Sequence, residues 1–381
     1  MQTTSLFCYT HSVKKIIFFV LLIVGILGAN QVNAQEIHQD LQGVWRAKVV
    51  EIVSTKEGSV PGTQLKATVQ YIRAQILEGE RAGERVLVKN DYLKLKEGDK
   101  FYMNYLITVE GVEMFSVRDV DRRATLAILV GLFAFVVILF SGKQGVRSLL
   151  SLMGSFLMII FVLLPLLLRG YAPIPTSILV GALVLFCAIY FTHGFNFSST
   201  IAFAGTTSAV VLTGILAYVA VHASRLSGFY SDETVYLNLN TNGTLNFEGL
   251  LLGGIIIGVL GVLDDIAVTQ VAVVSELKHL NKDLTFKEIY FKALRVGREH
   301  VSALVNTLVL AYAGVSLPLM LWVSQSNSSF STIINDEIFA TEIVRTLVGS
   351  IGLILTVPIT TFLAVYFAHR LKHTHIHSHG H

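Results

Sequence analysis

Seven long apolar runs dominate the chain after about residue 122. Each is about as long as the 20 residues that an α-helix needs to cross a bilayer, and polar segments separate one run from the next. The runs fall near residues 124–141, 149–168, 174–192, 200–222, 250–275, 301–322 and 344–367. This pattern predicts an α-helical polytopic membrane domain over residues 123–368, with about seven transmembrane helices.

A different pattern fills residues 35–122. Short segments rich in Val, Ile, Tyr and Phe partly alternate between apolar and polar positions, and Gly-containing turns such as LEGERAGE and KEGDK separate them. Such alternation is typical of strands that bury one face. We therefore predict a small N-terminal all-β domain, an OB-like barrel of five strands. It would bind a ligand, or serve as a structural module that docks an envelope protein partner.

The first 34 residues have the features of a secretory signal. Lys14 and Lys15 precede the apolar run IIFFVLLIVGIL, and small residues ending at Ala34 form a plausible cleavage site. We predict a signal peptide over residues 1–34, with an uncleaved anchor helix as the alternative. In either case the β domain that follows is extracytoplasmic.

Charge adds an orientation to this organisation. Only 14% of the residues are charged, whereas soluble domains carry about 25%. The segments between helices that would lie inside, together with the C-terminal tail, hold ten Lys and Arg. The external loops after residue 168 hold only Arg169 and Arg225, with Arg345 at the start of a helix. The positive-inside rule therefore predicts a multi-pass protein of the cytoplasmic membrane, with the β domain outside and the C-terminus in the cytoplasm.

Two adjacent acids, Asp264 and Asp265, interrupt the apolar run at 250–275. An Asp near the bilayer centre costs about 2.5–3.5 kcal/mol on the mildest insertion scale, so such residues usually have a function. Counting 1.5 Å per residue from the end of the run places the pair near the midplane. No Lys or Arg lies at that depth, and we expect the pair to bind and release a proton. The alternative is a neutral, hydrogen-bonded pair that only joins helices.

The acids share a helix with a line of small residues. Positions spaced four-three-four-four-three-four lie on one helical face, and here they are Gly254, Gly258, Gly261, Asp265, Thr269, Ala272 and Glu276. Small residues at this spacing allow another helix to approach closely. We therefore expect this face to pack against protein, with Asp265 more buried than Asp264.

Polar residues on the next two apolar runs fall near the same depth. They would support the acids as one polar cluster and comprise Asn306, Thr307, Tyr312, Thr356 and Thr360. Between the runs, residues 276–300 interleave apolar and basic side chains, which predicts an amphipathic helix lying along the membrane surface.

The C-terminal tail, residues 369–381, is rich in histidine. It offers imidazoles to Zn²⁺ or Ni²⁺ at His373, His375, His377, His379 and His381. Flexible His-rich tails also bind metal incidentally. The two cysteines, Cys8 and Cys187, are too few and too apolar in setting for a disulfide framework or a Cys-based metal site.

The chain resembles the YibE/F family of bacterial membrane proteins. The blocks GIIIGVLGVLDDIAVTQVAVVSELK, RVGREH and NTLVLAYAGVSLPL carry this resemblance. A more distant similarity is to the RND and SecD/SecF transport superfamily. It rests on the order of a helix rich in small residues with Asp265, then Glu276, Arg295 and Arg298, then Asn306-Thr307. That similarity implies acids that carry protons. This chain departs from that superfamily in two ways. It has seven predicted helices where the superfamily's repeat has five, and its external domain is far smaller than a porter domain.

These observations favour a non-enzymatic, proton-coupled transporter or translocation-associated protein. One alternative is a membrane scaffold or assembly factor whose β domain docks an envelope partner. A weaker one is a Mg²⁺-dependent polyprenyl-phosphate transferase, because Gly261 to Asp265 is similar to its GxxDD motif but no Lys follows. We expect membrane lipids around the protein, no nucleic acid and no cofactor, and a homo-oligomer stays open.

Overall fold

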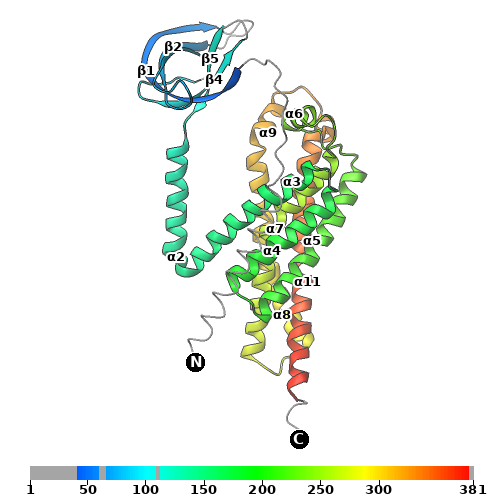
Figure 1. The fold of residues 1–381 in the computed structure, drawn as a ribbon. Helices are drawn as coiled ribbons and strands as arrows, with labels where there is room; N and C mark the ends of the chain where they lie inside the picture. Colours follow the sequence, from blue (N-terminus) through cyan, green and yellow to red (C-terminus); the bar gives the residue numbers. More distant parts are fainter. Residues whose placement is uncertain (1–40, 60–65, 92, 109–111, 377–381) are drawn as a thin grey trace. The chain divides into compact units, whose positions relative to one another are not determined.

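A computed structural model describes residues 41–59, 66–91, 93–108 and 112–376. The predicted signal segment, residues 1–34, lies outside the described residues. The chain divides into two compact units between Leu139 and Phe140, and each is described by itself. The first unit contains a β-barrel and the start of a long helix, and the second is a helical bundle (Figure 1).

The five strands of the first unit form a closed barrel in the order β1-β2-β3-β5-β4. The strands are β1 (Leu41–Ser59), β2 (Lys66–Ile76), β3 (Arg85–Asn90), β4 (Lys100–Ile107) and β5 (Glu113–Val120). β1 pairs with β4 through its first half and with β2 through its second half, and register shifts near Val49 and Ile52 accompany this change of partner. Such bulges bend a strand. The predicted five-stranded, OB-like barrel is confirmed.

Alternation along the strands fills the barrel. In β3 every second residue is buried, as the period of a strand requires. Two polar side chains are buried with this apolar core, because each satisfies the backbone of the segment after β3. Gln70 accepts from Leu95 N at 2.8 Å and donates to Leu95 O at 3.1 Å, and Asn90 donates to Gln70 at 2.9 Å. Leu95 thereby closes one end of the barrel core.

One carboxylate joins the barrel to the helix that follows it. Asp121 accepts from Arg46 of β1 at 2.7 Å and from Arg123, the first residue of α2, at 2.9 Å. Its side chain is only 4% exposed. The Arg123 guanidinium also lies 5.4 Å from the centre of the Tyr102 ring. Hydrogen bonds from Arg123, more than those from Arg46, hold the pKa of Asp121 well below its usual range.

Asp121→Asn is therefore expected to destabilise the barrel in a pH-dependent way. Because the folded-state pKa of Asp121 is lowered, its contribution to stability is present above the unfolded-state value of about 3.9 and disappears as pH falls below it. The variant should unfold at a lower temperature than wild type at pH 7, and the difference should vanish in acid. Thermal unfolding followed by Trp45 fluorescence, in a Trp322→Phe background, measures this. A pH-independent difference would contradict it.

Ten α-helices and one π-helical turn follow in the described part of the chain, and most run alongside one another (Figure 1). They are α2 (Arg123–Met158), η1 (Ile159–Leu163), α3 (Leu164–Leu168), α4 (Pro173–His193), α5 (Phe197–Ala223), α6 (Asp232–Asn240), α7 (Phe247–Leu280), α8 (Phe286–Val315), α9 (Leu317–Ser324), α10 (Phe330–Asn335) and α11 (Glu337–Ile376).

Five of these helical segments among the described residues are long and apolar enough to cross a membrane, or six if α8 and α9, which meet at a 62° bend, form one broken span. The first candidate, Arg123–Leu168, has 46 residues, more than twice the about 20 that one crossing requires. It contains both of the first two predicted runs. Gly142 breaks its helical geometry with φ 53°, a left-handed conformation that favours glycine. The polytopic helical architecture is confirmed, and the first two predicted runs lie on either side of the kink at Gly142.

Helices α5, α7 and α11 pack closely because glycines stand where one helix crosses another. A Cβ atom on Gly205 of α5 would lie 2.6 Å from Thr360 Oγ1 of α11, and Gly352 of α11 lies equally tightly against Thr213 of α5. Helix α4 packs on α7 in the same way, through Gly249 and Gly253. Such close approach is the usual basis of helix association in membranes.

The prediction of a separate surface helix at residues 276–300 is wrong. Helix α7 continues to Leu280, a short turn follows, and α8 begins at Phe286. Thr285 caps α8 by accepting from Glu288 N, and the Glu288 side chain accepts from Thr285 N at 2.8 Å, a capping box. Ile289, Ala293 and Gly297 of α8 are buried. The apolar side of the amphipathic pattern is therefore the side of α8 that is buried in the bundle, and α7 and α8 form a helical hairpin.

Candidate functional site

The two acids lie near the middle of α7, as predicted, but their burial is reversed. Asp265 is exposed, whereas Asp264 is partly buried and its Oδ1 atom has no hydrogen-bond partner. The face of α7 that packs against α5 and α11 carries large aliphatic residues such as Ile256, Val259 and Leu263. Asp265 projects away from that face. The expectation that Asp265 is the more buried acid is wrong.

The line of small residues on α7 is also exposed instead of packed. Gly254 and Gly261 have no atom within 4 Å of the position that a Cβ would take, and Ala272 and Glu276 are exposed. Gly258 has one close neighbour, the Tyr312 hydroxyl, 3.3 Å from that position. Thr269, on the same line, is partly buried. Asp265 thus lies on an open face of α7, defined here by Gly254, Gly258, Gly261, Asp265, Ala272 and Glu276.

Two histidines that the sequence analysis did not select interact electrostatically with one of the acids. The Asp265 carboxyl interacts with His300 of α8 and with His193 at the end of α4. An imidazole titrates near neutral pH and exchanges protons readily. His300 stands in the RVGREH block and His193 ends an apolar run, so each was visible as a histidine at a membrane boundary. Only the folded arrangement shows that both interact with Asp265.

The register between α7 and α8 explains where the predicted supporting residues lie. Tyr312 lies at Gly258, and Gly297 packs against Gln270, so the two helices run antiparallel about a turn at residues 281–285. In this register Asn306, with Thr307 after it, lies at the level of Gly261 and the acids. Both are exposed.

The threonines of α11 belong to a different polar layer. Thr356 and Thr360 are fully buried. Thr356 donates to Gly352 O at 2.8 Å, and Thr360 packs against Gly205. Beside them Thr361 donates to Gln270 of α7 at 2.9 Å. These residues join α5, α7 and α11, and the prediction of one polar cluster around the acids is wrong.

A polar pocket leads from the end of the bundle toward the acids. It has a volume of about 380 Å³, lies between α4, α5 and α7, and is lined by His193, Asn196, Ser198, Ser199, Ser275 and Glu276 with several apolar residues. Its inner wall includes Val268, one helical turn from Asp264. The pocket therefore extends from the bundle end to within one helical turn of Asp264.

The blocks with the acid pair and the two helices that follow it lie in a region that matches a known family. The family model described as YibE/F-like protein matches residues 129–370. The chain belongs to the YibE/F family. The match covers the helical bundle of this YibE/F protein, including Asp264 and Asp265, and confirms the resemblance seen in the sequence. No curated protein and no solved structure matches the chain, and the distant similarity to the RND and SecD/SecF superfamily stays a prediction.

No group of three or more His, Cys, Asp or Glu side chains in the described part of the YibE/F protein has the geometry of a metal site. Of the predicted tail ligands, His373 and His375 lie in the last turns of α11, where only the backbone is described. His377, His379 and His381 lie outside the described residues. Metal binding by the tail stays a prediction.

Proposed function

We propose that this YibE/F protein is a non-enzymatic, proton-coupled transporter whose proton carriers are Asp264 and Asp265. The observation that supports this most directly is that Asp265 is exposed near the middle of α7 and interacts electrostatically with His193 and His300. A carboxyl facing lipid at that depth would be costly. We propose instead that water reaches this face, so that the carboxyl can exchange protons with the two imidazoles.

The polar pocket supplies one route for those protons. Glu276 and His193 line the pocket at the bundle end, and His193 also interacts with Asp265. A proton entering there passes from Glu276 or water to the His193 imidazole and then to the Asp265 carboxylate. Asp264, the next residue, presents a buried oxygen without a partner. We assign it the role of sharing the proton with Asp265, so that the charge is not left unpaired away from water.

Proton movement by the purified protein tests this proposal. Full-length protein is reconstituted into vesicles that contain a pH-sensitive dye, and a pH gradient is imposed. We expect proton flux above that of protein-free vesicles and a clear loss of it in the Asp264→Asn/Asp265→Asn double variant. Equal flux in the double variant and wild type would reject the two acids as carriers.

We also propose that the barrel is extracytoplasmic and that the α7–α8 turn and the C-terminus face the cytoplasm. The distribution of Lys and Arg supports this orientation. In a chain without its native cysteines, a reporter cysteine within residues 230–245 should react with a membrane-impermeant reagent added from outside. One within 282–292 should react only after the membrane is opened. The reverse pattern would contradict the orientation.

A further inference from the structure

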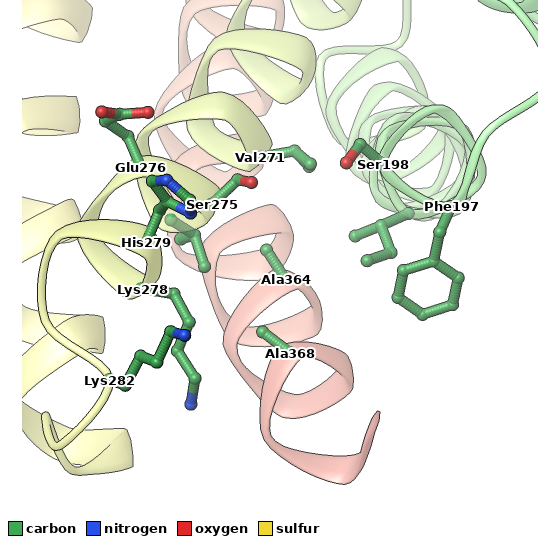
Figure 2. A pocket seen from close by; sticks show the side chains of 12 residues that line it. Phe197, Ser198, Val271, Ser275, Glu276, Lys278, His279, Lys282, Ala364 and Ala368 are labelled. Carbon is green, nitrogen blue, oxygen red and sulfur yellow. The ribbon is translucent and has the colours of Figure 1, made fainter. Parts of the chain in front are cut away.

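A second pocket lies at the same end of the bundle, between α5, α7 and α11 (Figure 2). Its volume is about 660 Å³, within the range of about 300–1,000 Å³ that is usual for ligand sites. One wall is apolar and includes Phe197, Val271 and Ala368. The other carries the cationic groups at the end of α7. The pocket therefore combines an apolar wall with a charged rim.

Basic side chains dominate the charged rim. Lys278 and His279 come from the last turn of α7, and Lys282 comes from the turn after it. The Lys278 Nζ atom lies 2.6 Å from His369 Nδ1 of α11, which fixes Lys278 beside the pocket. Glu276 is the one acid among the lining residues, and in Figure 2 its carboxylate points away from both lysines. The side of the pocket nearest the bundle end is thus positively charged.

Hydroxyl groups on two sides of the pocket add neutral donors. Ser198 of α5 and Ser275 of α7 both line the pocket, and Figure 2 shows them on opposite sides of it. Lysine ammonium groups with nearby hydroxyls are a common way to bind a phosphate. The apolar wall is formed by residues of α5, α7 and α11, three helices that are long and apolar enough to cross a membrane. A soluble phosphate compound would leave that wall unused.

We propose that this pocket binds the phosphate headgroup of an anionic membrane lipid, with the lipid's chains along the apolar wall. Basic pockets between helices at the cytoplasmic membrane surface bind such headgroups in other membrane proteins. The proposed orientation places the pocket at the cytoplasmic leaflet. The binding itself does not depend on proton transport, and a failure of one proposal leaves the other standing.

Lipid retention by the full-length protein in neutral detergent tests the site. Phosphatidylglycerol and phosphatidylcholine are added in parallel, and bound lipid is counted by native mass spectrometry. Wild type should retain phosphatidylglycerol in preference to phosphatidylcholine. Lys278→Gln/Lys282→Gln should weaken phosphatidylglycerol binding at least about tenfold, because charge-assisted hydrogen bonds are lost. Lys282→Gln alone, which keeps the Lys278–His369 contact, should show a smaller loss with the same sign.

The matched control is Lys287→Gln/Lys292→Gln, which removes the same charge from exposed positions of α8 outside the pocket. It should retain phosphatidylglycerol as wild type does. Equal losses in both double variants would overturn the proposal in favour of general surface attraction. Competition by inorganic phosphate at the same concentration as lipid would overturn it in favour of a soluble phosphate ligand. Absence of any preference for phosphatidylglycerol in wild type would overturn it outright.

Discussion

Asp265→Asn should abolish proton-coupled activity while leaving the protein folded and inserted. The amide keeps the shape of the side chain and removes only its ability to bind and release a proton, so the proposed exchange with His193 and His300 would stop. In the dye assay we expect flux to fall to the level of protein-free vesicles, with the yield, monodispersity and thermal unfolding of wild type. Activity that keeps its pH dependence in Asp265→Asn would reject this residue as a proton carrier.

Asp264→Asn is the matched comparison. It also replaces a carboxyl by an amide, one residue away, but at a position without the two imidazoles. We expect a slower but still pH-dependent flux, because the exposed acid keeps its partners while losing a like-charged neighbour. If both acids only joined helices, each variant would behave like wild type. If Asp264→Asn were the more damaging change, the carrier would be the buried acid.

Gly352→Ala should destabilise the bundle. The added methyl group would meet the Thr213 side chain, with its Cγ2 atom at 2.9 Å, and Thr213 cannot turn aside freely because its hydroxyl donates to Ala209 O at 2.7 Å. Overpacking of this kind costs about 1–3 kcal/mol, which exceeds the about 1 kcal/mol that alanine gains over glycine in a helix. Thermal unfolding in detergent should show a clearly lower midpoint.

Gly261→Ala is the control for this change. It makes the same substitution in a membrane helix, on the open face of α7, where no atom lies within 4 Å of the position that the added Cβ would take. We expect an unchanged or slightly higher unfolding temperature. A strong loss in Gly261→Ala, accompanied by a change in oligomeric state, would show that a second copy covers the open face.

The elements of this protein were predictable because each follows from a simple physical requirement. A helix that crosses a bilayer needs an apolar run of fixed minimum length, and a half-buried strand needs alternation. The apolar runs and the alternating segments at 35–122 met those requirements, and the structure confirms helices and a barrel there. The acid pair was found because carboxyls are rare at that depth.

The packing face of α7 was not predictable in the same way. Most positions around this helix are apolar, so hydrophobicity does not distinguish the side that meets α5 from the side that is open. Glycine spacing suggested one side, and the large residues Ile255, Ile256 and Val259 packed on the other. The glycines that do allow close approach, such as Gly205 and Gly352, are recognised only when the opposing side chain is known.

The wrong prediction that Tyr312 lies at the depth of the two acids has a specific cause. The prediction treated residues 276–300 as a separate surface helix, so the two membrane helices would end at 275 and begin at 301. Counting residues from these two ends places Tyr312 at the depth of the acids. The actual turn at 281–285 shifts α8 along α7, so Tyr312 meets Gly258 and His300 approaches Asp265. The sequence contained a sign of this turn, since T-F-K-E at Thr285 to Glu288 has the capping-box spacing.

The central position of Asp265 on α7 also exposes it to the electric field of the membrane. Moving one elementary charge across the whole bilayer changes its energy by about 2.3 kcal/mol per 100 mV. A proton that reaches Asp265 from one side crosses about half of that field, which corresponds to about 1.2 kcal/mol per 100 mV, close to a tenfold change in occupancy. The membrane potential would thus help to load or unload this carboxyl even where the two solutions have the same pH.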